Sequence, residues 1–213
     1  MFDQFEIAKE LCDMNPSRSL VFSILIIVVS GCSINAQRRF ERLPPPRDPQ
    51  FYEPRNKLED FEGRAQTLLI KGRHWVGTVR TQNGSVRVEA TEIRDLAASA
   101  TASGAVITIV ADGGPPGEIR ALIDYDEIAP LLKAMDTALK AGDGISRLSH
   151  FEVRYRTKAD FEVMVFKQME NNAIAAAIEG GFFDRSRLYL TLDELTKLRW
   201  MISQAKDQLD QAK

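Results

Sequence analysis

IDYDEI (Ile123–Ile128) and LTLDEL (Leu190–Leu195) are two similar hexapeptides, each of which follows a predicted strand and opens a predicted helix. In each of them an Asp or Thr side chain stands three residues before a glutamate, which is the spacing of a capping box. An apolar residue before the cap and another at the fourth helical position form a hydrophobic staple. The sequence therefore predicts two helices that begin in the same way.

The rest of the pattern around the hexapeptides is also repeated. Apolar residues recur with helical spacing over 125–140 and 192–209. Before each helix, alternation of apolar and polar residues predicts a series of strands, over 74–81, 85–93, 105–111 and 118–123 and then over 151–157, 161–167, 173–178 and 188–190.

We therefore predict an α+β fold in a single domain over 61–213, made of two tandem antiparallel β-meander plus helix units at about 72–144 and 149–213. The two helices are expected to cover the sheets. The alternative is one strongly bent sheet, or an open barrel, with two covering helices.

A short apolar run, LVFSILIIVVSGC, occupies Leu20–Cys32. It is shorter than the roughly 20 residues that a membrane-spanning helix needs, and has the length of a signal-peptide core. Residues 1–13 are too acidic for a good leader, so we expect Met14 to be the true start within a signal peptide over 1–31. A signal peptide would place the chain after the apolar run outside the cytoplasm. Three arginines between residues 38 and 42 favour the opposite orientation, because positive charge normally marks the side of the membrane that stays inside.

The end of this run, Val29-Ser30-Gly31-Cys32, resembles the lipobox of bacterial lipoproteins. The resemblance implies cleavage before Cys32, lipid attachment to its thiol, and a place in the cell envelope. Ser33, where an Asp would retain such a protein, implies sorting to the outer membrane, with the membrane itself as a partner through the lipid. The alternative is ordinary signal cleavage after Ala36, which would release a soluble secreted protein.

Residues 32–60 are polar and proline-rich, with three consecutive prolines at 44–46. Such a composition favours an extended, stiff chain, so we predict a tether between the lipid anchor and the domain. A Pro-rich recognition motif is the alternative.

The chain has 28 basic and 30 acidic residues, of which two basic and four acidic residues lie before Cys32, so the predicted mature protein is formally neutral. This balance does not indicate nucleic acid as a partner.

The predicted domain offers few groups for catalysis. It has no cysteine besides the predicted lipidation site, and its histidines, His74 and His150, are not in a metal-ligand spacing. The carboxylates at the helix starts are explained by capping. We therefore expect no enzymatic activity, no catalytic residue, no metal and no cofactor. Several arginines on alternating strand positions are expected to form ion pairs with glutamates on neighbouring strands of a solvated sheet face. The arginines are Arg80, Arg87, Arg94, Arg154 and Arg156, and the glutamates are Glu89, Glu152 and Glu162.

Phe182 and Phe183 follow two glycines in a predicted loop and are candidates for contact with a partner, with core packing as the alternative.

The sequence leaves three functions open. The first is a non-enzymatic, membrane-tethered interaction module for another protein or a second copy. The second is a carrier of a lipid or other apolar ligand. The third rests on topology alone: the repeated unit is similar to that of the Whirly and Pur-type single-strand-binding folds, although no motif of these families is found.

Overall fold

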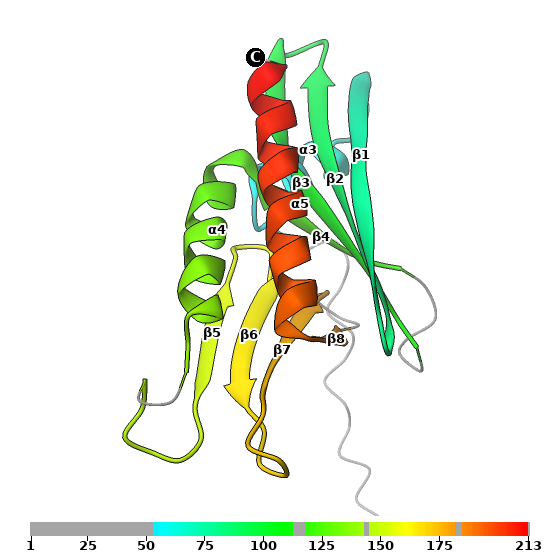
Figure 1. The fold of residues 1–213 in the computed structure, drawn as a ribbon. Helices are drawn as coiled ribbons and strands as arrows, with labels where there is room; N and C mark the ends of the chain where they lie inside the picture. Colours follow the sequence, from blue (N-terminus) through cyan, green and yellow to red (C-terminus); the bar gives the residue numbers. More distant parts are fainter. Residues whose placement is uncertain (1–52, 113–117, 143–144, 182–184, 213) are drawn as a thin grey trace, which may run out of the picture. The chain divides into compact units, whose positions relative to one another are not determined.

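The computed structural model describes residues 53–112, 118–142, 145–181 and 185–212 (Figure 1). A short helix, α3 (Lys57–Gly63), comes first. The first unit then consists of β1 (Leu69–Thr81), β2 (Gly84–Asp95), β3 (Ala100–Ala111), β4 (Ile119–Asp124) and α4 (Tyr125–Leu139). The second consists of β5 (Glu152–Arg156), β6 (Glu162–Lys167), β7 (Ile174–Gly180), β8 (Ser186–Leu190) and α5 (Leu192–Gln211).

Each unit forms its own four-stranded antiparallel meander, with the strands in chain order. The predicted α+β fold of two meander-plus-helix units is therefore confirmed. The described strands form two sheets, and not the single bent sheet or open barrel that was the alternative.

Two strands of the first sheet begin earlier than the sequence predicts. β1 starts at Leu69 and not at 74, and β3 starts at Ala100 and not at 105. Residues 70–75 of β1 are exposed, because β1 is an edge strand and this part extends beyond the core. Apolar and polar residues alternate only where one face of a strand is buried, so the exposed part of β1 carries no such signal.

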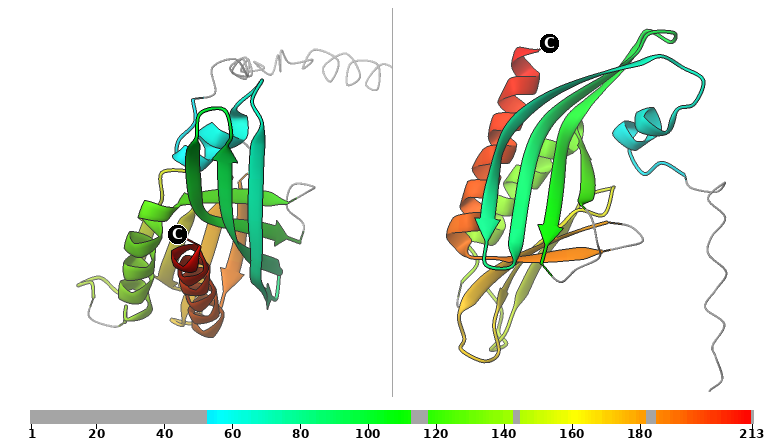
Figure 2. Two further views of the ribbon diagram at one scale, coloured as in Figure 1. Left: turned by 90° about the horizontal axis from the view of Figure 1, so that it is seen from above. Right: turned by 90° about the vertical axis from the view of Figure 1, so that its right-hand side faces the viewer.

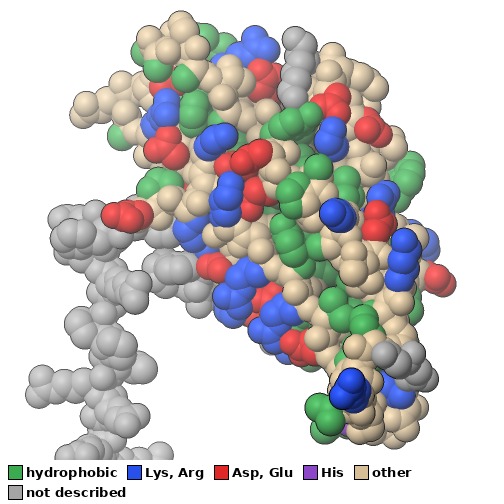
Figure 3. Space-filling model, turned by 90° about the vertical axis from the view of Figure 1, so that its left-hand side faces the viewer, with side chains coloured by type: hydrophobic (Ala, Val, Ile, Leu, Met, Phe, Trp, Pro, Cys, Tyr) green, Lys and Arg blue, Asp and Glu red, His purple; other side chains and the backbone are tan. Residues whose placement is uncertain are grey.

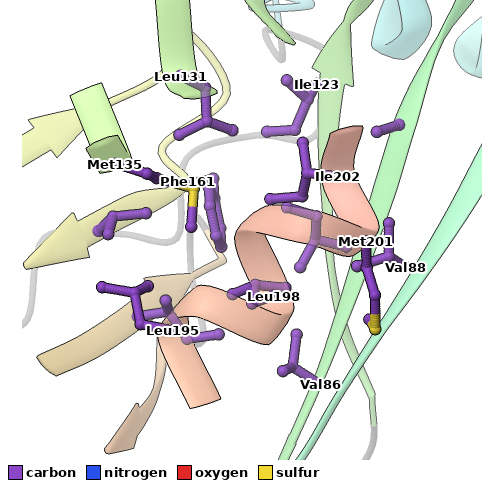
Figure 4. Packing of buried hydrophobic residues seen from close by; sticks show 14 of the residues in the cluster. Val86, Val88, Ile123, Leu131, Met135, Phe161, Leu195, Leu198, Met201 and Ile202 are labelled. Carbon is purple, nitrogen blue, oxygen red and sulfur yellow. The ribbon is translucent and has the colours of Figure 1, made fainter. Parts of the chain in front are cut away.

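The two helices join the units into one core. Helix α5 belongs to the second unit but packs against β1, β2 and β3 of the first sheet, and α4 lies against strands of both sheets and against α5 (Figures 1 and 2). The approach of α5 is close at Gly77, where an added Cβ would lie 3.2 Å from Sδ of Met201. The interior between the helices and the two sheets is apolar (Figure 4), and its labelled members include Val86, Val88, Ile123, Leu131, Met135, Phe161, Leu195, Leu198 and Ile202.

Helix α3 begins in the segment for which the sequence predicts a tether, over 32–60, so the folded domain begins before residue 61. The side chains of Leu58 and Phe61 pack on the face of the first sheet opposite α5, in a second apolar cluster with Ile93, Val106 and Leu122. A seven-residue helix with only two inward-facing apolar side chains is too short to show a helical period in the sequence, especially after a proline-rich segment.

Residues 1–52 lie outside the described part of the chain, and with them the predicted signal peptide, the lipobox and most of the predicted tether. Within the described part, no helix has both the length and the apolar composition needed to cross a bilayer.

Candidate functional site

The residues predicted for lipid attachment and partner contact cannot be placed. Cys32, Phe182 and Phe183 all lie outside the described residues. The two histidines are in different units: His74 is exposed on β1, and His150 precedes β5 with a buried Nδ1 that has no hydrogen-bond partner. They share no contact that the structure describes, and no group of three metal-ligating side chains occurs among the described residues.

The carboxylates at the helix starts are engaged in capping. Both predicted capping boxes are present, with Glu127 reaching back to the N–H of Asp124 (3.3 Å) and Glu194 to the N–H of Thr191 (2.7 Å). The carboxylate of Asp124 also accepts hydrogen bonds from the N–H groups of Lys57 (2.9 Å) and Leu58 (3.0 Å) at the start of α3. Asp124 therefore connects two helices, which the sequence did not indicate.

The exposed face of the second sheet carries an arginine–glutamate cluster, consisting of Arg154, Arg156, Arg185, Arg187, Glu152, Glu162 and Glu179. Glu162 is buried, and its carboxylate lies 3.1 Å from the guanidinium of Arg154 and 2.6 Å from that of Arg156 on the neighbouring strand. The hydrogen bonds that Arg154 donates to the carboxylate of Glu152 raise the pKa of Arg154.

The predicted cross-strand ion pairing is confirmed for Arg154 and Arg156 with Glu162. Arg87 and Glu89 also pair (3.6 Å), but both lie on β2, and Arg80 has no ion pair among the described residues. Arg94 pairs with Glu92 on its own strand. Each charge of the arginine–glutamate cluster thus has an opposite charge beside it.

An apolar groove lies between α4 and the edge strand β5, and we call it the α4–β5 groove. Its volume is about 350 Å³. Figure 3 faces this side of the molecule, where hydrophobic side chains run between charged ones. The groove is lined by Pro130, Lys133, Ala134, Thr137 and Ala138 of α4, by Val153, Arg154 and Tyr155 of β5, and by Val163 of β6.

The α4–β5 groove reaches the free edge of β5. Successive side chains of a strand point to opposite faces, and the groove is lined by Val153, Arg154 and Tyr155 together, hence by both faces of the strand. β5 pairs with β6 on one side only and is the first strand of its sheet. The backbone groups on its other side are thus available to a further strand.

Polar groups stand at the rim and wall of the groove. Lys133 is exposed and has no ion-pair partner among the residues that the structure places. The hydroxyl of Tyr155 likewise has no hydrogen-bond partner in the described part of the chain, and burial raises its pKa, so it stays protonated and can donate a hydrogen bond. An apolar floor with one free cation and one free hydroxyl can hold an apolar group beside an anionic one.

Pro130 is an unfavourable residue for its position. It lies inside helix α4, where a proline removes a backbone hydrogen bond and costs about 3 kcal/mol. Its side chain is exposed and lines the groove. A residue that opposes the local structure without contributing to the core is typical of a functional surface.

A second cleft, of about 590 Å³, lies where the β1–β2 turn meets the start of α5. Two of its lining residues, Thr191 and Glu194, are already bonded to each other in the capping box, and Oδ1 of Asn83 accepts the N–H of Tyr189 (3.2 Å). Thr191 and Glu194 are thus engaged in capping α5, and Asn83 in joining the first unit to β8.

The α4–β5 groove is not apparent from the sequence, because it forms only where the consecutive elements α4 and β5 pack beside each other, and no local pattern specifies that packing. The one local signal is Pro130 inside an otherwise regular helical pattern. Comparison of the chain with protein families, with curated proteins and with solved structures found no match.

Proposed function

We propose that the protein is a non-enzymatic interaction module that binds an extended segment of a partner protein in the α4–β5 groove. The observation that carries the proposal is the coincidence of an apolar groove with an unpaired strand edge. In this mode of recognition the main chain of the ligand adds a strand to the sheet, and its alternate side chains enter pockets.

The groove specifies the chemistry of the segment. Its floor of Ala134, Ala138, Val153 and Val163 suits an aliphatic side chain of moderate size. The free ammonium group of Lys133 favours an acidic residue or a terminal carboxylate beside that side chain. The ligand is thus an extended segment in which apolar and acidic residues alternate.

Carriage of a small apolar ligand is the competing function. A carrier buries most of its ligand in an enclosed cavity, whereas the α4–β5 groove is open along one side and has an unsatisfied strand edge as its wall. A strand edge offers hydrogen bonds that a hydrocarbon chain cannot use. The free strand edge therefore favours a peptide over a small apolar molecule as the ligand of the groove.

The test is selection of peptides from a displayed random library by the full chain held in detergent. Ala134→Trp fills the groove, and Ala129→Trp places the same side chain at an exposed position of α4 outside the groove. We expect enriched sequences that alternate apolar and acidic residues, bind the Ala129→Trp variant as well as the wild type, and fail to bind Ala134→Trp.

Charge reversal refines this test. Lys133→Glu should weaken the selected peptides about fivefold, as expected for the loss of one exposed ion pair worth about 1 kcal/mol. Enriched peptides that bind wild type and Ala134→Trp equally would refute the groove as the site. Displacement of the peptides by a fatty acid, with tighter binding of the acid than of any peptide, would establish the carrier function instead.

The cellular placement is part of the proposal and is supported by the sequence alone. The lipobox-like residues Val29–Cys32 favour a lipid-anchored protein of the cell envelope. The intact mass of the protein from its host membrane tests this placement. A chain that begins at Cys32 with added acyl mass is expected, whereas a chain that begins at Gln37 would make it a secreted protein.

A further inference from the structure

The two sheets have four edge strands, β1, β4, β5 and β8. Two of them are bonded at the backbone by an asparagine of another element. Nδ2 of Asn56 donates to the carbonyl of Leu122 in β4 (2.6 Å). Oδ1 of Asn83 accepts the N–H of Tyr189 in β8 (3.2 Å). Within the described residues no such bond is made to β1 or β5, so these two edges are open to a strand of another chain.

The hydrogen bonds at the two ends of β5 show which of its backbone groups face outward. Phe151, just before β5, and Thr157, just after it, each share a backbone hydrogen bond with the β6 side of the ladder (3.1 and 2.9 Å). Bonded and non-bonded pairs alternate along an antiparallel ladder, so the odd-numbered residues of β5 bond to β6. The N–H and C=O groups of Glu152, Arg154 and Arg156 therefore point to the free edge.

The sequence of β5, Glu-Val-Arg-Tyr-Arg, is complementary to itself when a second copy runs antiparallel with Arg154 opposite Arg154. The outward-pointing residues of the two copies then lie opposite one another, so their backbone groups are in phase for hydrogen bonding. Glu152 of each copy lies opposite Arg156 of the other, which gives two pairs of opposite charges. The two Arg154 side chains meet at the two-fold axis, where each already has the carboxylates of Glu152 (2.5 Å) and Glu162 (3.1 Å) beside it.

The other face of the paired strands is apolar. In this register Val153 of each copy lies opposite Tyr155 of the other, and a β-branched side chain beside an aromatic one is a favourable cross-strand pair. Both residues line the α4–β5 groove. A second copy that pairs at this edge therefore covers the groove with the same kind of side chain that the groove itself presents.

The other free edge, β1, lacks this complementarity. Its residues 69–81 include Lys71 and Arg73 but no acidic residue. Two copies of β1 would bring cations together without an opposite charge between them, and charged edge strands of this kind resist pairing with their own copies. Self-complementarity thus distinguishes β5 from β1.

We propose that two copies of the chain pair through β5, antiparallel about Arg154, so that the second sheets of the two copies become one continuous sheet. The arrangement has two-fold symmetry, which is the commonest symmetry of protein oligomers. This inference rests on the proposed function, because it names a second copy of the chain as the partner strand of the α4–β5 groove.

A disulfide at the two-fold axis tests the partner and the register together. The experiment uses the full chain in detergent with both native cysteines replaced by serine, and adds Arg154→Cys. Glu162 keeps ion pairs with Arg156 and Arg185 in this variant. Opposed Cα atoms of a hydrogen-bonded pair lie about 5.5 Å apart, a distance that a disulfide spans. Oxidised glutathione should therefore link most of the chain into a dimer.

The matched control is Arg73→Cys in the same cysteine-free background. It replaces an exposed arginine on the free edge strand that is not self-complementary, so it should remain monomeric under the same oxidation.

Charge reversal provides a second test, without any cross-link. Sedimentation of the full chain in detergent measures the dissociation constant of the dimer. Glu152→Arg should raise this constant about tenfold, because each dimer loses two exposed ion pairs. Glu118→Arg reverses a similarly exposed glutamate just before β4 and should leave the constant unchanged.

Three results would overturn the proposal. A chain that stays monomeric at every concentration would refute a second copy as the partner. A dimer that Glu152→Arg does not weaken would show that the copies associate elsewhere, as through the apolar run over 20–32 in a shared micelle. Equal cross-linking at positions 73 and 154 would show random collision. None of these results involves a peptide, so the proposed function still stands or falls with the loss of peptide binding in Ala134→Trp.

Discussion

Asp124 provides the sharpest test of the structure, because its side chain serves two helices at once. It stands at the N-cap of α4, and its carboxylate accepts the N–H groups of Lys57 and Leu58 at the start of α3. Asp124 is only 2% exposed, so water cannot readily replace it. Thr191 has the equivalent position before α5, but it is exposed and caps that helix alone.

Alanine substitution is therefore expected to lower the free energy of unfolding by different amounts at the two positions. Thr191→Ala removes one exposed cap and should lower the free energy of unfolding by about 1 kcal/mol. Asp124→Ala removes a cap and also two hydrogen bonds to a charged acceptor, one of which leaves the buried N–H of Leu58 without a partner. Adding roughly 1 kcal/mol for each of these bonds gives a total of about 3 kcal/mol.

Urea unfolding followed by circular dichroism measures both values. Asp124→Ser separates the two contributions, since serine can cap α4 but is too short to reach α3, and should recover about 1 kcal/mol. If Asp124→Ala and Thr191→Ala lower the stability by the same 1 kcal/mol, α3 is not held by Asp124 and the account of this junction is wrong.

Three further predictions concern single residues. Gly104→Ala should destabilise the fold by about 2 kcal/mol in the same assay, because an added Cβ would lie 2.0 Å from the carbonyl of Ile123, and an unchanged stability would contradict this packing. Pro130→Ala should raise the stability by about 2 kcal/mol by restoring a helical hydrogen bond, which thermal unfolding can check. Hydrogen bonds from the N–H of Ala98 and neighbouring groups lower the pKa of Asp95. Its contribution to stability is therefore complete above about pH 4 and is lost as the pH falls through the lowered value, so Asp95→Asn should be less sensitive to acid than the wild type in this range.

The fold was predictable from the sequence wherever a local signal coincided with burial. Helices α4 and α5 begin at the predicted residues, Tyr125 and Leu192, because capping boxes are short and local. β2 was found because one of its faces is in the core, and alternation of apolar and polar residues follows from this. The early part of β1 was missed because neither of its faces is buried there.

The site was less predictable, because its parts come from different elements. Ala134 and Val153 are unremarkable in the sequence, and only packing brings them to opposite walls of one groove. The same holds for Glu162, whose burial depends on arginines from neighbouring segments. Sequence reasoning identified these charges as a paired sheet face but had no means to find the groove beside them.

The α4–β5 groove exists because helices α4 and α5, although they start alike, differ in length and in the elements they pack against. Helix α5 has 20 residues, about 30 Å, and extends along the long strands of the first sheet. Helix α4 has 15 residues, about 22 Å, and must contact both sheets and α5 at once. Positioned in this way, α4 packs against β5 but leaves a groove between them. The edge strand of the second sheet is thus left open beside an apolar helix face, and an unpaired edge with a defined groove is where we expect a partner strand to bind.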